Sequence, residues 1–539
     1  MKNVCLSGKS NLLFLALLAA ILSGSHLSAQ HVTEVQSLSG ERWWGGVVAY
    51  GTRMPYVQPL EEFDLARQNS GNQTAPLLLS SKGRYVWSDR PFLFSVTEQG
   101  EGVTLRSDYE RIAVQTAGAT LREAYLDACR RHFPPSGRLP DTLFFTAPQY
   151  NTWIELMYNQ NQADILSYAQ GIADNGFPAG VLMIDDNWQK YYGNFEFKPD
   201  KFPSPGAMVD KLHSMGFRVM LWICPFVSAD SPEYRTLSAK GYLISDTSGK
   251  PAVISWWNGQ SACYDFTNPA AAAHFISELK NMQQAYGIDG FKFDAGDNSF
   301  YAGSHLVSYK KDAIAADHTL AWAKMGLEFP LNEYRACWKM GGQALVQRLG
   351  DKDYSWNALR LLIPDMAAAG LLGYAYACPD MVGGGQYTSF LNVDEKMFDQ
   401  MLIVRSAQIH ALMPMMQFSV APWRILGKEN LAIVRSMALL HEKFGAYIVA
   451  CARDAAKTGE PIVRHMEYAF PNEGFAECKD QLMLGEKYMV APVAAKENTR
   501  TVRLPKGRWK DDTGEIHKGG KTITLSVPPE RLPYFERLK

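Results

Sequence analysis

The stretch GIDGFKFDAGD (residues 287–297) is typical of a short buried strand, yet it ends in carboxylates. Phe291 and Phe293 supply large apolar side chains, and Asp294 and Asp297 follow them. A carboxylate is costly to remove from water unless it is paired or hydrogen-bonded, so its place here requires a reason. Either the two acids only cap a turn, or the strand delivers an acid to a functional site.

On both sides of this stretch, apolar strand-like runs alternate with runs whose apolar residues have helical spacing. The strand-like runs are apolar throughout, which is typical of parallel strands covered on both faces. The alternation repeats about eight times, which predicts a (β/α)8 TIM barrel over residues 141–455. The predicted strands include residues 142–151, 180–188, 217–227, 288–296, 344–353 and 371–385, and the predicted helices include residues 161–176, 206–216, 271–287 and 358–370.

The segments that flank the barrel contain short strand-like runs separated by turns. We expect an N-terminal β-sandwich over residues 30–140, with a helix at residues 121–133, and a small C-terminal β-domain over residues 456–539. The predicted fold class is therefore α/β, with a central barrel between two β-rich domains. The runs are residues 46–51, 84–88, 91–96, 102–107, 461–470, 488–494, 500–505 and 521–526.

The first residues of the chain have the pattern of a secretory signal peptide. Lys2 and Lys9 precede the apolar run 12–22, and small residues follow as far as residue 29. The run is shorter than the about 20 apolar residues that span a bilayer, and no later segment is long enough. Cys5 precedes the run, so it is not placed to become a lipid anchor. We expect a signal peptide over residues 1–29 and a soluble mature protein, without a membrane span, that is periplasmic or secreted.

The composition is that of a globular protein and excludes several kinds of partner. Hydrophobic residues make up 47% of the 539 and charged residues 20%, and the formal net charge is −1. A chain without a basic stripe is not expected to bind nucleic acid. The 11 histidines form no H-x-H or H-E-x-x-H motif and the cysteines are scattered, so we expect no metal and no cofactor. The sequence leaves open a single disulfide and the oligomeric state.

Acidic residues end several of the predicted barrel strands. The carboxyl ends of TIM-barrel strands meet at one mouth, where active sites are built, so these acids should converge. A single Asp after a strand is more often a helix cap or a turn former. Acids at several strand ends, with no basic cluster to pair them, favour cleavage of a glycosidic bond, which needs two carboxyl groups in opposite protonation states. The acids are Asp185, Asp186, Asp294, Asp297, Asp351, Asp353 and Asp380.

Several of these motifs resemble glycoside hydrolase family 31. Residues 287–297 resemble the family's nucleophile strand, and RACWKMGGQALVQRLGDKDYSW (residues 335–356) resembles its acid/base segment without a gap. The sequence around the acids most resembles the branch that includes the myogenesis-regulating glycosidase. This branch is associated with α-galactosides. Shorter matches occur in the family's order: WWGG (43–46), IDDNW (184–188) with FEFKPDKFP (195–203), and PDMVGGG (379–385).

The resemblance implies a retaining exo-α-glycosidase that needs no cofactor. Its expected substrate is a terminal α-linked hexose of an oligosaccharide or glycoconjugate, with an α-galactoside preferred. Asp294 takes the position of the nucleophile and Asp351 that of the acid/base, with Asp353 as the alternative acid/base. The residues assigned to substrate binding are Asp185, Asp186, Trp222, Lys292, Asp297, Arg335, Trp356 and Asp380.

The role of Lys292 and the nature of the whole protein stay open at this point. Lys292 lies two residues before Asp294, on the same face of the strand. It either holds Asp294 ionised, or binds a sugar hydroxyl, or forms a structural ion pair with Asp289 or Asp297. Trp222 is either a platform beneath the sugar or an ordinary core residue. For the chain as a whole, the alternatives are an α-glucosidase of the same family and a catalytically silent carbohydrate-binding protein.

Overall fold

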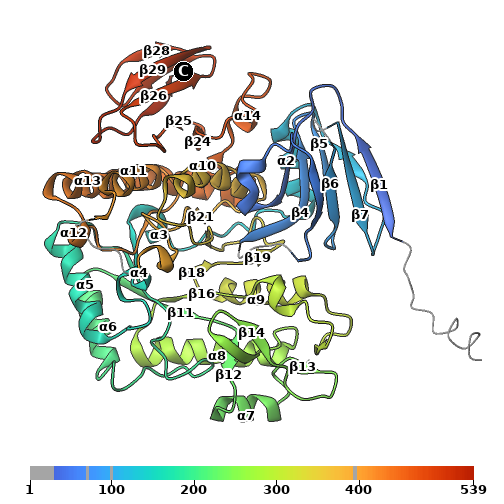
Figure 1. Ribbon diagram of the computed structural model, residues 1–539, viewed down its shortest axis with the longest axis vertical. Helices are drawn as coiled ribbons and strands as arrows, with labels where there is room; N and C mark the ends of the chain where they lie inside the picture. Colours follow the sequence, from blue (N-terminus) through green and yellow to red (C-terminus); the bar gives the residue numbers. More distant parts are fainter. Residues whose placement is uncertain (1–29, 68–71, 98–100, 392–396, 539) are drawn as a thin grey trace, which may run out of the picture.

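The computed structural model describes residues 30–67, 72–97, 101–391 and 397–538. The predicted signal peptide, residues 1–29, lies outside the described residues. Among the described helices, none is long and apolar enough to cross a membrane. Figure 1 shows a β-rich N-terminal part in blue, a central barrel with its helices in teal to orange, and a β-rich C-terminal part in red.

The central part is a closed barrel of parallel strands that pair in the order of the sequence. The last strand, β22, pairs with the first, β9, and a bridge between Met381 and Gln417 joins the end of β21 to β22. The predicted TIM barrel is therefore confirmed. Its strands are β9 (Gln149–Asn151), β10 (Val181–Ile184), β11 (Arg218–Ile223), β16 (Gly290–Phe293), β18 (Leu331–Tyr334), β20 (Gln347–Arg348), β21 (Ala377–Cys378) and β22 (Gln417–Phe418).

Parallel pairing sets a row of polar side chains inside the barrel. Trp222 of β11 lies beside Lys292 of β16, which lies beside Glu333 of β18. Alternate residues of a strand point to opposite faces, so Phe293, the neighbour of Lys292, points outward. Its ring lies 5.2 Å from that of Trp322 on helix α9. Strand β16 is thus apolar toward the helices and charged toward the barrel interior.

Helices surround the barrel, and local signals in the sequence set their ends. The side chain of Asn161 accepts the N–H of Asp164 at the start of α5, and Gly287 ends α8 with a left-handed φ of +75°, which glycine adopts without strain. The helices are α3 (Leu143–Thr146), α4 (Trp153–Leu156), α5 (Gln162–Asp174), α6 (Pro205–Ser214), α7 (Pro232–Ala239), α8 (Pro269–Tyr286), α9 (Ala315–Met325), α10 (Trp356–Leu371), α11 (Gln400–Ala411) and α12 (Pro422–Ile425).

The predicted first barrel strand, residues 142–151, is wrong in its first half. Its opening residues form α3, because the side chain of Asp141 accepts the N–H of Leu143 and starts a helical turn. Only Gln149–Asn151 form the strand β9. The apolar run therefore contains a short helix followed by a strand, which apolar character alone does not distinguish.

A small antiparallel sheet is inserted between β11 and α8. The turn between β14 and β15 carries Trp257 and Asn258 toward the mouth of the barrel, where both contact residues of the candidate site. The strands between β11 and α8 are β12 (Phe226–Ser228), β13 (Ser245–Asp246), β14 (Ile254–Trp256) and β15 (Gly259–Cys263). The short elements between β16 and β18 are η3 (Asn298–Tyr301), β17 (Leu306–Val307) and η4 (Gly326–Glu328).

The N-terminal part consists of two packed sheets, as predicted. A Cβ added to Gly46 of β2 would lie 3.2 Å from the ring of Phe94 of β6, so the sheets pack face to face. The predicted strand 46–51 is only partly formed, since Val48–Arg53 make the 3-10 turn η1. Helix α2 (Leu121–His132) leads to the barrel. One sheet contains β1 (His31–Gln36), β7 (Gly102–Ser107), β6 (Leu93–Val96) and β3 (Leu60–Asp64), and the other β19 (Cys337–Trp338), β4 (Gln73–Ser80), β5 (Arg84–Trp87) and β8 (Val114–Thr116), with β2 (Trp43–Val47) paired to β4.

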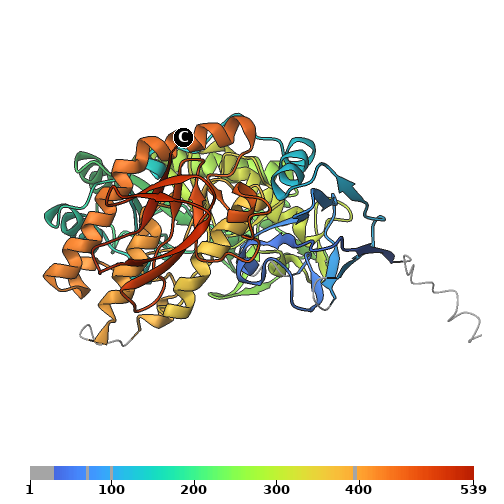
Figure 2. The same cartoon turned by 90° about the horizontal axis from the view of Figure 1, so that it is seen from above.

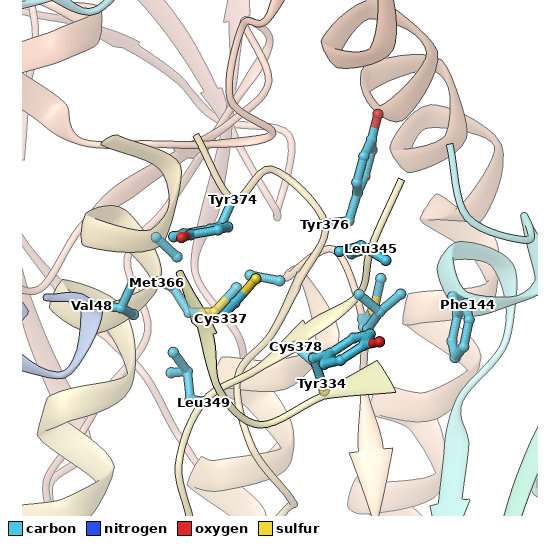
Figure 3. Close-up of a cluster of buried hydrophobic side chains, with 14 of the residues drawn as sticks. Val48, Phe144, Tyr334, Cys337, Leu345, Leu349, Met366, Tyr374, Tyr376 and Cys378 are labelled. Atoms are coloured by element: carbon cyan, nitrogen blue, oxygen red, sulfur yellow. The ribbon is translucent and has the colours of Figure 1, made fainter. Parts of the chain in front are cut away.

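The N-terminal part and the barrel share one hydrophobic core. Strand β19, which follows barrel strand β18, leaves the barrel and pairs in parallel with β4. Gly51 of η1 lies directly against the backbone of Pro364 in α10, so a side chain there would clash. Figure 3 shows Val48, Cys337 and Met366 in this joint core. The two parts are therefore packed as one body.

The C-terminal part follows α13 (Lys428–Thr458), a helix of 31 residues that lies beneath the red C-terminal strands in Figure 1, and Figure 2 shows these strands in front of the orange helices. Phe444 of this helix packs on Tyr488 of β25. The predicted strand 461–470 is wrong in its second half, because His465 accepts the N–H of Glu467 and starts helix α14 (Met466–Ala469). The strands are β23 (Val463–Arg464), β24 (Leu482–Leu484), β25 (Tyr488–Val490), β26 (Thr499–Leu504), β27 (Arg508–Asp511), β28 (Ile516–Lys518), β29 (Lys521–Ser526) and β30 (Tyr534–Leu538).

Candidate active site

Most of the predicted site residues line one cavity of about 250 Å³ at the carboxyl ends of the barrel strands. A hollow of about 270 Å³ beside α7 and α8 contains none of them. The acids of separate strands thus converge, as the barrel geometry requires. The cavity is lined by Trp153, Tyr158, Asp185, Asp186, Trp222, Trp257, Lys292, Asp294, Arg335, Arg348, Asp351, Gln386 and Tyr387.

Asp294 directly follows β16 and is held by fixed donors and nearby cations. Trp222 Nε1 donates to Oδ2 at 2.7 Å, and the backbone N–H of Ala295 donates to Oδ1 at 2.8 Å. Burial alone would raise the pKa of Asp294, but the charges of Lys292 and Arg335 and the hydrogen bond from Trp222 outweigh burial and lower it. Asp294 is therefore kept ionised in a buried site, which is the state that a carboxylate nucleophile requires.

Lys292 forms a buried ion pair with Asp185, so of the alternatives for Lys292 the pairing with Asp289 or Asp297 is wrong. Its Nζ lies 2.7 Å from Oδ2 of Asp185, and the two side chains are 4% and 3% exposed. Burial would lower the pKa of Lys292, but the negative charge of Asp185 and of other carboxylates raises it above the usual value. Lys292 lines the cavity as a cation whose charge acts on both Asp185 and Asp294.

Asp289 was not available to Lys292 because it lies at the opposite end of β16. Its Oδ2 is 2.7 Å from His213 Nε2 and accepts the N–H of Val219 at 2.8 Å, while its Oδ1 is 3.1 Å from Arg218 Nη1. This aspartate joins β16 to β11 and α6 at the amino ends of the strands. It has no contact with the cavity.

Arg335 connects Asp294 to Asp297. Its Nε lies 3.3 Å from Oδ2 of Asp297 and 3.9 Å from Oδ1 of Asp294, and its guanidinium stacks over Trp257 at 5.0 Å. Asp297 lies behind Arg335 and does not line the cavity. The position of Asp297 fits support of Arg335 better than the direct substrate contact that was predicted.

Asp351 and Asp380 share the guanidinium of Arg348. Nη1 of Arg348 lies 2.8 Å from Oδ1 of Asp351 and 2.6 Å from Oδ1 of Asp380. Oδ2 of Asp380 accepts the backbone N–H groups of Lys352 and Gly385. Burial raises the pKa of Asp380 to about 6 against the opposing charge of Arg348. Asp351 lines the cavity, whereas Asp380 lies beneath it, so a direct contact of Asp380 with a sugar hydroxyl does not fit its place.

Two further predicted residues lie away from the cavity. Asp353, the alternative acid/base, is exposed, and its carboxylate accepts a long hydrogen bond of 3.4 Å from Ser389. Trp356 begins α10, and its Nε1 donates to Oδ2 of Asp399 at 3.1 Å. The structure therefore brings Asp351, and not Asp353, to the same cavity as Asp294, and it leaves Trp356 as a helix-packing residue.

Asp186 is held in a network of neutral donors. The hydroxyl of Tyr192 donates to its carboxylate at 3.2 Å, and Asn258 Nδ2 donates to Oδ2 at 2.8 Å. Tyr158 in turn donates to Oδ1 of Asn258 at 2.9 Å. Burial, reinforced by the charge of Asp185, raises the pKa of Asp186 to about 7. This carboxyl therefore changes its charge near neutral pH within the cavity wall.

Sequence reasoning did not single out several residues that line the cavity. Arg348 lies within the motif that identified Asp351, and Gln386 and Tyr387 directly follow the glycines of residues 383–385, so their places could have been inferred. Trp257 lies on the turn of an inserted hairpin, and no pattern in the sequence shows where such a turn is directed. The missed residues are Trp153, Tyr158, Trp257, Arg348, Gln386 and Tyr387.

Among the described residues, one group of acids and a histidine could share a cation. The acids and histidines that lie close enough to share a cation are Asp511, Glu515 and His517, on β27, β28 and their turn. Asp511 already accepts hydrogen bonds from Thr513 and the backbone of Glu515, which explains the cluster as a structural turn. In the cavity, Asp185, Asp294 and Asp351 are paired with cationic or neutral donors of the protein.

Two carboxyl groups in one cavity at a barrel mouth are the arrangement of a glycoside hydrolase. The protein-family model for the TIM-barrel domain of glycosyl hydrolases family 31 matches residues 147–441 of the chain. The family model for the C-terminal domain of the same family matches residues 459–538. The chain therefore belongs to glycosyl hydrolase family 31.

Named relatives agree with this assignment. The myogenesis-regulating glycosidase of Mus musculus is 32% identical over 418 residues, which cover 75% of this chain and 58% of that protein. An α-xylosidase of Emericella nidulans is 24% identical over 547 residues, covering 94% of this chain and 67% of that protein. The chain thus spans about three fifths to two thirds of the length of these two curated relatives.

Solved structures share the fold. A family 31 dextranase of Flavobacterium johnsoniae, complexed with glucose, has a TM-score of 0.82 at 19% identity and covers 94% of this chain and 66% of its own. An α-xylosidase from a soil metagenome, complexed with xylose, has a TM-score of 0.80 at 22% identity and covers 94% of this chain and 79% of its own. At these identities the likeness establishes the common architecture, including the parts on both sides of the barrel.

Proposed function

We propose that the chain is a retaining exo-α-glycosidase that removes a terminal α-linked hexose, with an α-galactoside preferred, from an oligosaccharide or glycoconjugate. The observation that carries the proposal is that Asp294 and Asp351, which come from different strands, line one cavity. Asp294 has the charge state of a nucleophile, and Asp351 faces the cavity with a side chain that is 25% exposed. Family membership supports the reaction class.

The reaction proceeds by two displacements at the anomeric carbon. First, a carboxylate oxygen of Asp294 attacks this carbon, the glycosidic C–O bond breaks, and Asp351 gives its proton to the leaving oxygen. The sugar is then esterified to Asp294. In the second step a water oxygen attacks the anomeric carbon, Asp351 accepts the proton of that water, and the ester bond breaks to restore the Asp294 carboxylate. Two inversions return the original α configuration.

The size of the cavity favours removal of one sugar at a time. Its volume of about 250 Å³ is at or below the lower end of the about 300–1,000 Å³ found for pockets that hold drug-sized ligands. The buried pair of Lys292 and Asp185 forms part of its wall. A single hexose at the chain end suits such a space better than the interior of a long polysaccharide.

The galactoside preference rests on the branch of the family that the motifs resemble. It is tested with the purified protein on nitrophenyl α-galactoside, α-glucoside, α-xyloside and α-N-acetylgalactosaminide. We expect the highest kcat/KM for the galactoside. A clear preference for the glucoside would replace the proposal with the α-glucosidase alternative. Sugar binding without turnover of any of the four substrates would favour the catalytically silent carbohydrate-binding protein.

A matched pair of variants tests the acid/base assignment. Asp351→Ala should lower kcat/KM by about 10²–10⁴-fold on a substrate with a poor leaving group, because leaving-group protonation is lost. It should keep much of its activity on a dinitrophenyl glycoside, whose leaving group departs without a proton. Asp353→Ala, in the same loop but outside the cavity, should behave like the unsubstituted protein. The reverse result would move the acid/base role to Asp353.

Export is a separate part of the proposal. The lysines and apolar run of residues 1–29 support cleavage near residue 29, which would leave a mature protein that begins close to β1. Mass spectrometry of the protein recovered from periplasm or medium should give a chain without these residues. A full-length chain confined to the cytoplasm would contradict the proposal.

A further inference from the structure

Arg348 places a cation in direct contact with the proposed acid. Its Nη1 lies 2.8 Å from Oδ1 of Asp351, and the arginine side chain is only 2% exposed. A buried cation beside a carboxyl group favours the ionised form of that group. An acid that must protonate a leaving oxygen needs the opposite, because only its protonated form has a proton to give. The contact between Arg348 and Asp351, taken alone, would oppose the first step of the reaction.

Asp380 changes this balance because it binds the same nitrogen. Its Oδ1 lies 2.6 Å from Nη1 of Arg348, and its Oδ2 accepts the N–H of Lys352 at 2.8 Å and that of Gly385 at 3.0 Å. Both oxygens face donors, so the ionised form of Asp380 is fully hydrogen-bonded, whereas a proton on it would find no acceptor among these partners. Asp380 is 0% exposed, so solvent does not screen its charge.

The carboxyl group of Asp351 has space for a proton, whereas both oxygens of Asp380 face donors. Among the described residues, Arg348 donates to Oδ1 of Asp351, and Asp351 lines the cavity. Gly385 keeps the two acids together, because a Cβ at this position would lie 2.8 Å from Oδ1 of both Asp351 and Asp380. Two ionised carboxylates on one guanidinium would leave a buried charge uncompensated, which is costly. Burial raises the pKa of Asp380 and so favours its protonation, whereas its two backbone donors favour its ionised form and leave the carboxyl of Asp351 as the group with space for a shared proton.

The other charged groups around this trio do not form an ion pair with Asp351 among the described residues. On β18, Oε1 of Glu333 lies 3.4 Å from Nε of Arg348, on the side away from Nη1. Lys352 donates its N–H to Asp380, but its ammonium lies 3.3 Å from Asp365 of α10. Asp294, Lys292 and Arg335 act on Arg348 through space, and the charge of Arg335 also acts on Asp351.

We propose that Arg348 and Asp380 form a fixed ion pair that positions Asp351, and that the charge of Asp380 allows Asp351 to keep a proton while it contacts Arg348. The inference rests on the proposed acid/base role of Asp351. Asp380 is here a positioning residue, because it lies beneath the cavity and acts only through Arg348 and Asp351.

The test is the pH profile of kcat/KM on the nitrophenyl glycoside that the unsubstituted protein cleaves best. Asp380→Asn should move the alkaline limb to lower pH by about one unit, because Asp351 then faces an unopposed cation. Arg348→Gln should move the same limb to higher pH by a similar amount, and the double variant should return toward the original profile. The control is Asp365→Asn, which removes a buried carboxyl that contacts Lys352 instead of Arg348, and which should leave the limb in place.

Opposite shifts distinguish this role from a merely structural one, which would lower activity at every pH without moving the limb. Thermal unfolding shows which variants are folded. If Arg348→Gln does not fold, Arg348→Lys takes its place in the experiment. Arg348→Lys keeps the positive charge, so it should leave the alkaline limb unchanged, whereas Asp380→Asn should still move the limb to lower pH. An alkaline limb that stays in place in folded Asp380→Asn overturns the inference. Full activity of Asp351→Ala on a poor leaving group would instead overturn the acid/base role, and the inference with it.

Discussion

Strand β16 has an aspartate at each end, and the two ends use it in different ways. At the amino end, the oxygens of Asp289 are taken by His213, Arg218 and the N–H of Val219, outside the cavity. At the carboxyl end, Asp294 receives one donor on each oxygen and still lines the cavity. In TIM barrels the amino-terminal face contributes to stability and the carboxyl-terminal face to catalysis. Strand direction therefore decides whether the same side chain is structural or chemical.

The largest expected effect lies at the carboxyl end. Asp294→Ala should lower kcat by about 10⁴-fold or more, because the nucleophile is lost. The fold should persist, because Lys292 keeps its ion pair with Asp185 and Arg335 keeps its ion pair with Asp297. Steady-state kinetics and thermal unfolding measure the two effects. Residual activity within about tenfold of the unsubstituted protein would refute the nucleophile assignment.

Between the two ends, Lys292→Met should destabilise the protein by about 3–5 kcal/mol, because Asp185 would be left as a buried unpaired carboxylate. Denaturant unfolding measures the loss. The double variant Lys292→Met with Asp185→Asn should recover part of it, since the stranded charge is then removed. A loss below about 1 kcal/mol in the single variant would show that the ion pair is not a main support of the barrel interior.

At the amino end, Asp289→Ala should cost about 1–3 kcal/mol of unfolding free energy, because the N–H of Val219 and the side chains of His213 and Arg218 lose their acceptor. Its kcat/KM, measured below the unfolding range, should stay within about twofold of the unsubstituted value. Strong loss of activity in a stable variant would break the contrast between the two ends of β16.

The effect that is smallest over a single pH unit concerns Asp186. Its pKa is about 7 in the folded chain and about 3.9 in an unfolded chain, so the folded chain binds more protons between these values. The stability from this group is present below about pH 4 and is lost as pH rises through 7, by at most about 1.4 kcal/mol per pH unit. Asp186→Asn should flatten this slope in unfolding free energy measured from pH 4 to 8. An unchanged slope would show that Asp186 is not the titrating group.

The barrel and the meeting of its acids could be predicted because both follow from local pattern. Alternation along β16 places Phe291 and Phe293 outward and Lys292 inward, whatever the rest of the chain does. The partner of Lys292 could not be predicted, because Asp185 follows β10 and strand β11 lies between β10 and β16. Their contact depends on the curvature of the closed barrel.

Other elements and contacts of the molecule have weak sequence signals and could not be predicted. Strand β22 is only Gln417–Phe418, and Gln417 is a fully buried polar residue that donates to Glu333, so the apolar residues 411–416 that precede the strand do not show where it lies. The hydrogen bond of Trp356 to Asp399 of the α11 cap joins segments 43 residues apart. Such contacts are fixed by tertiary packing, which neither residue reveals by itself.

Strand β19, which leaves the barrel to pair with β4, has a consequence for trimming and recombining this protein. Beside that pairing, Gln73 Nε2 donates to the carbonyl oxygens of Arg335 at 2.7 Å and Arg348 at 3.0 Å, and Asn72 accepts the N–H of Gly350. The N-terminal sandwich thus holds the backbone of both arginines that flank the proposed catalytic acids. It is no detachable module: a minimal catalyst must retain it, and a chimera between relatives must exchange it together with the loops of β18 and β20.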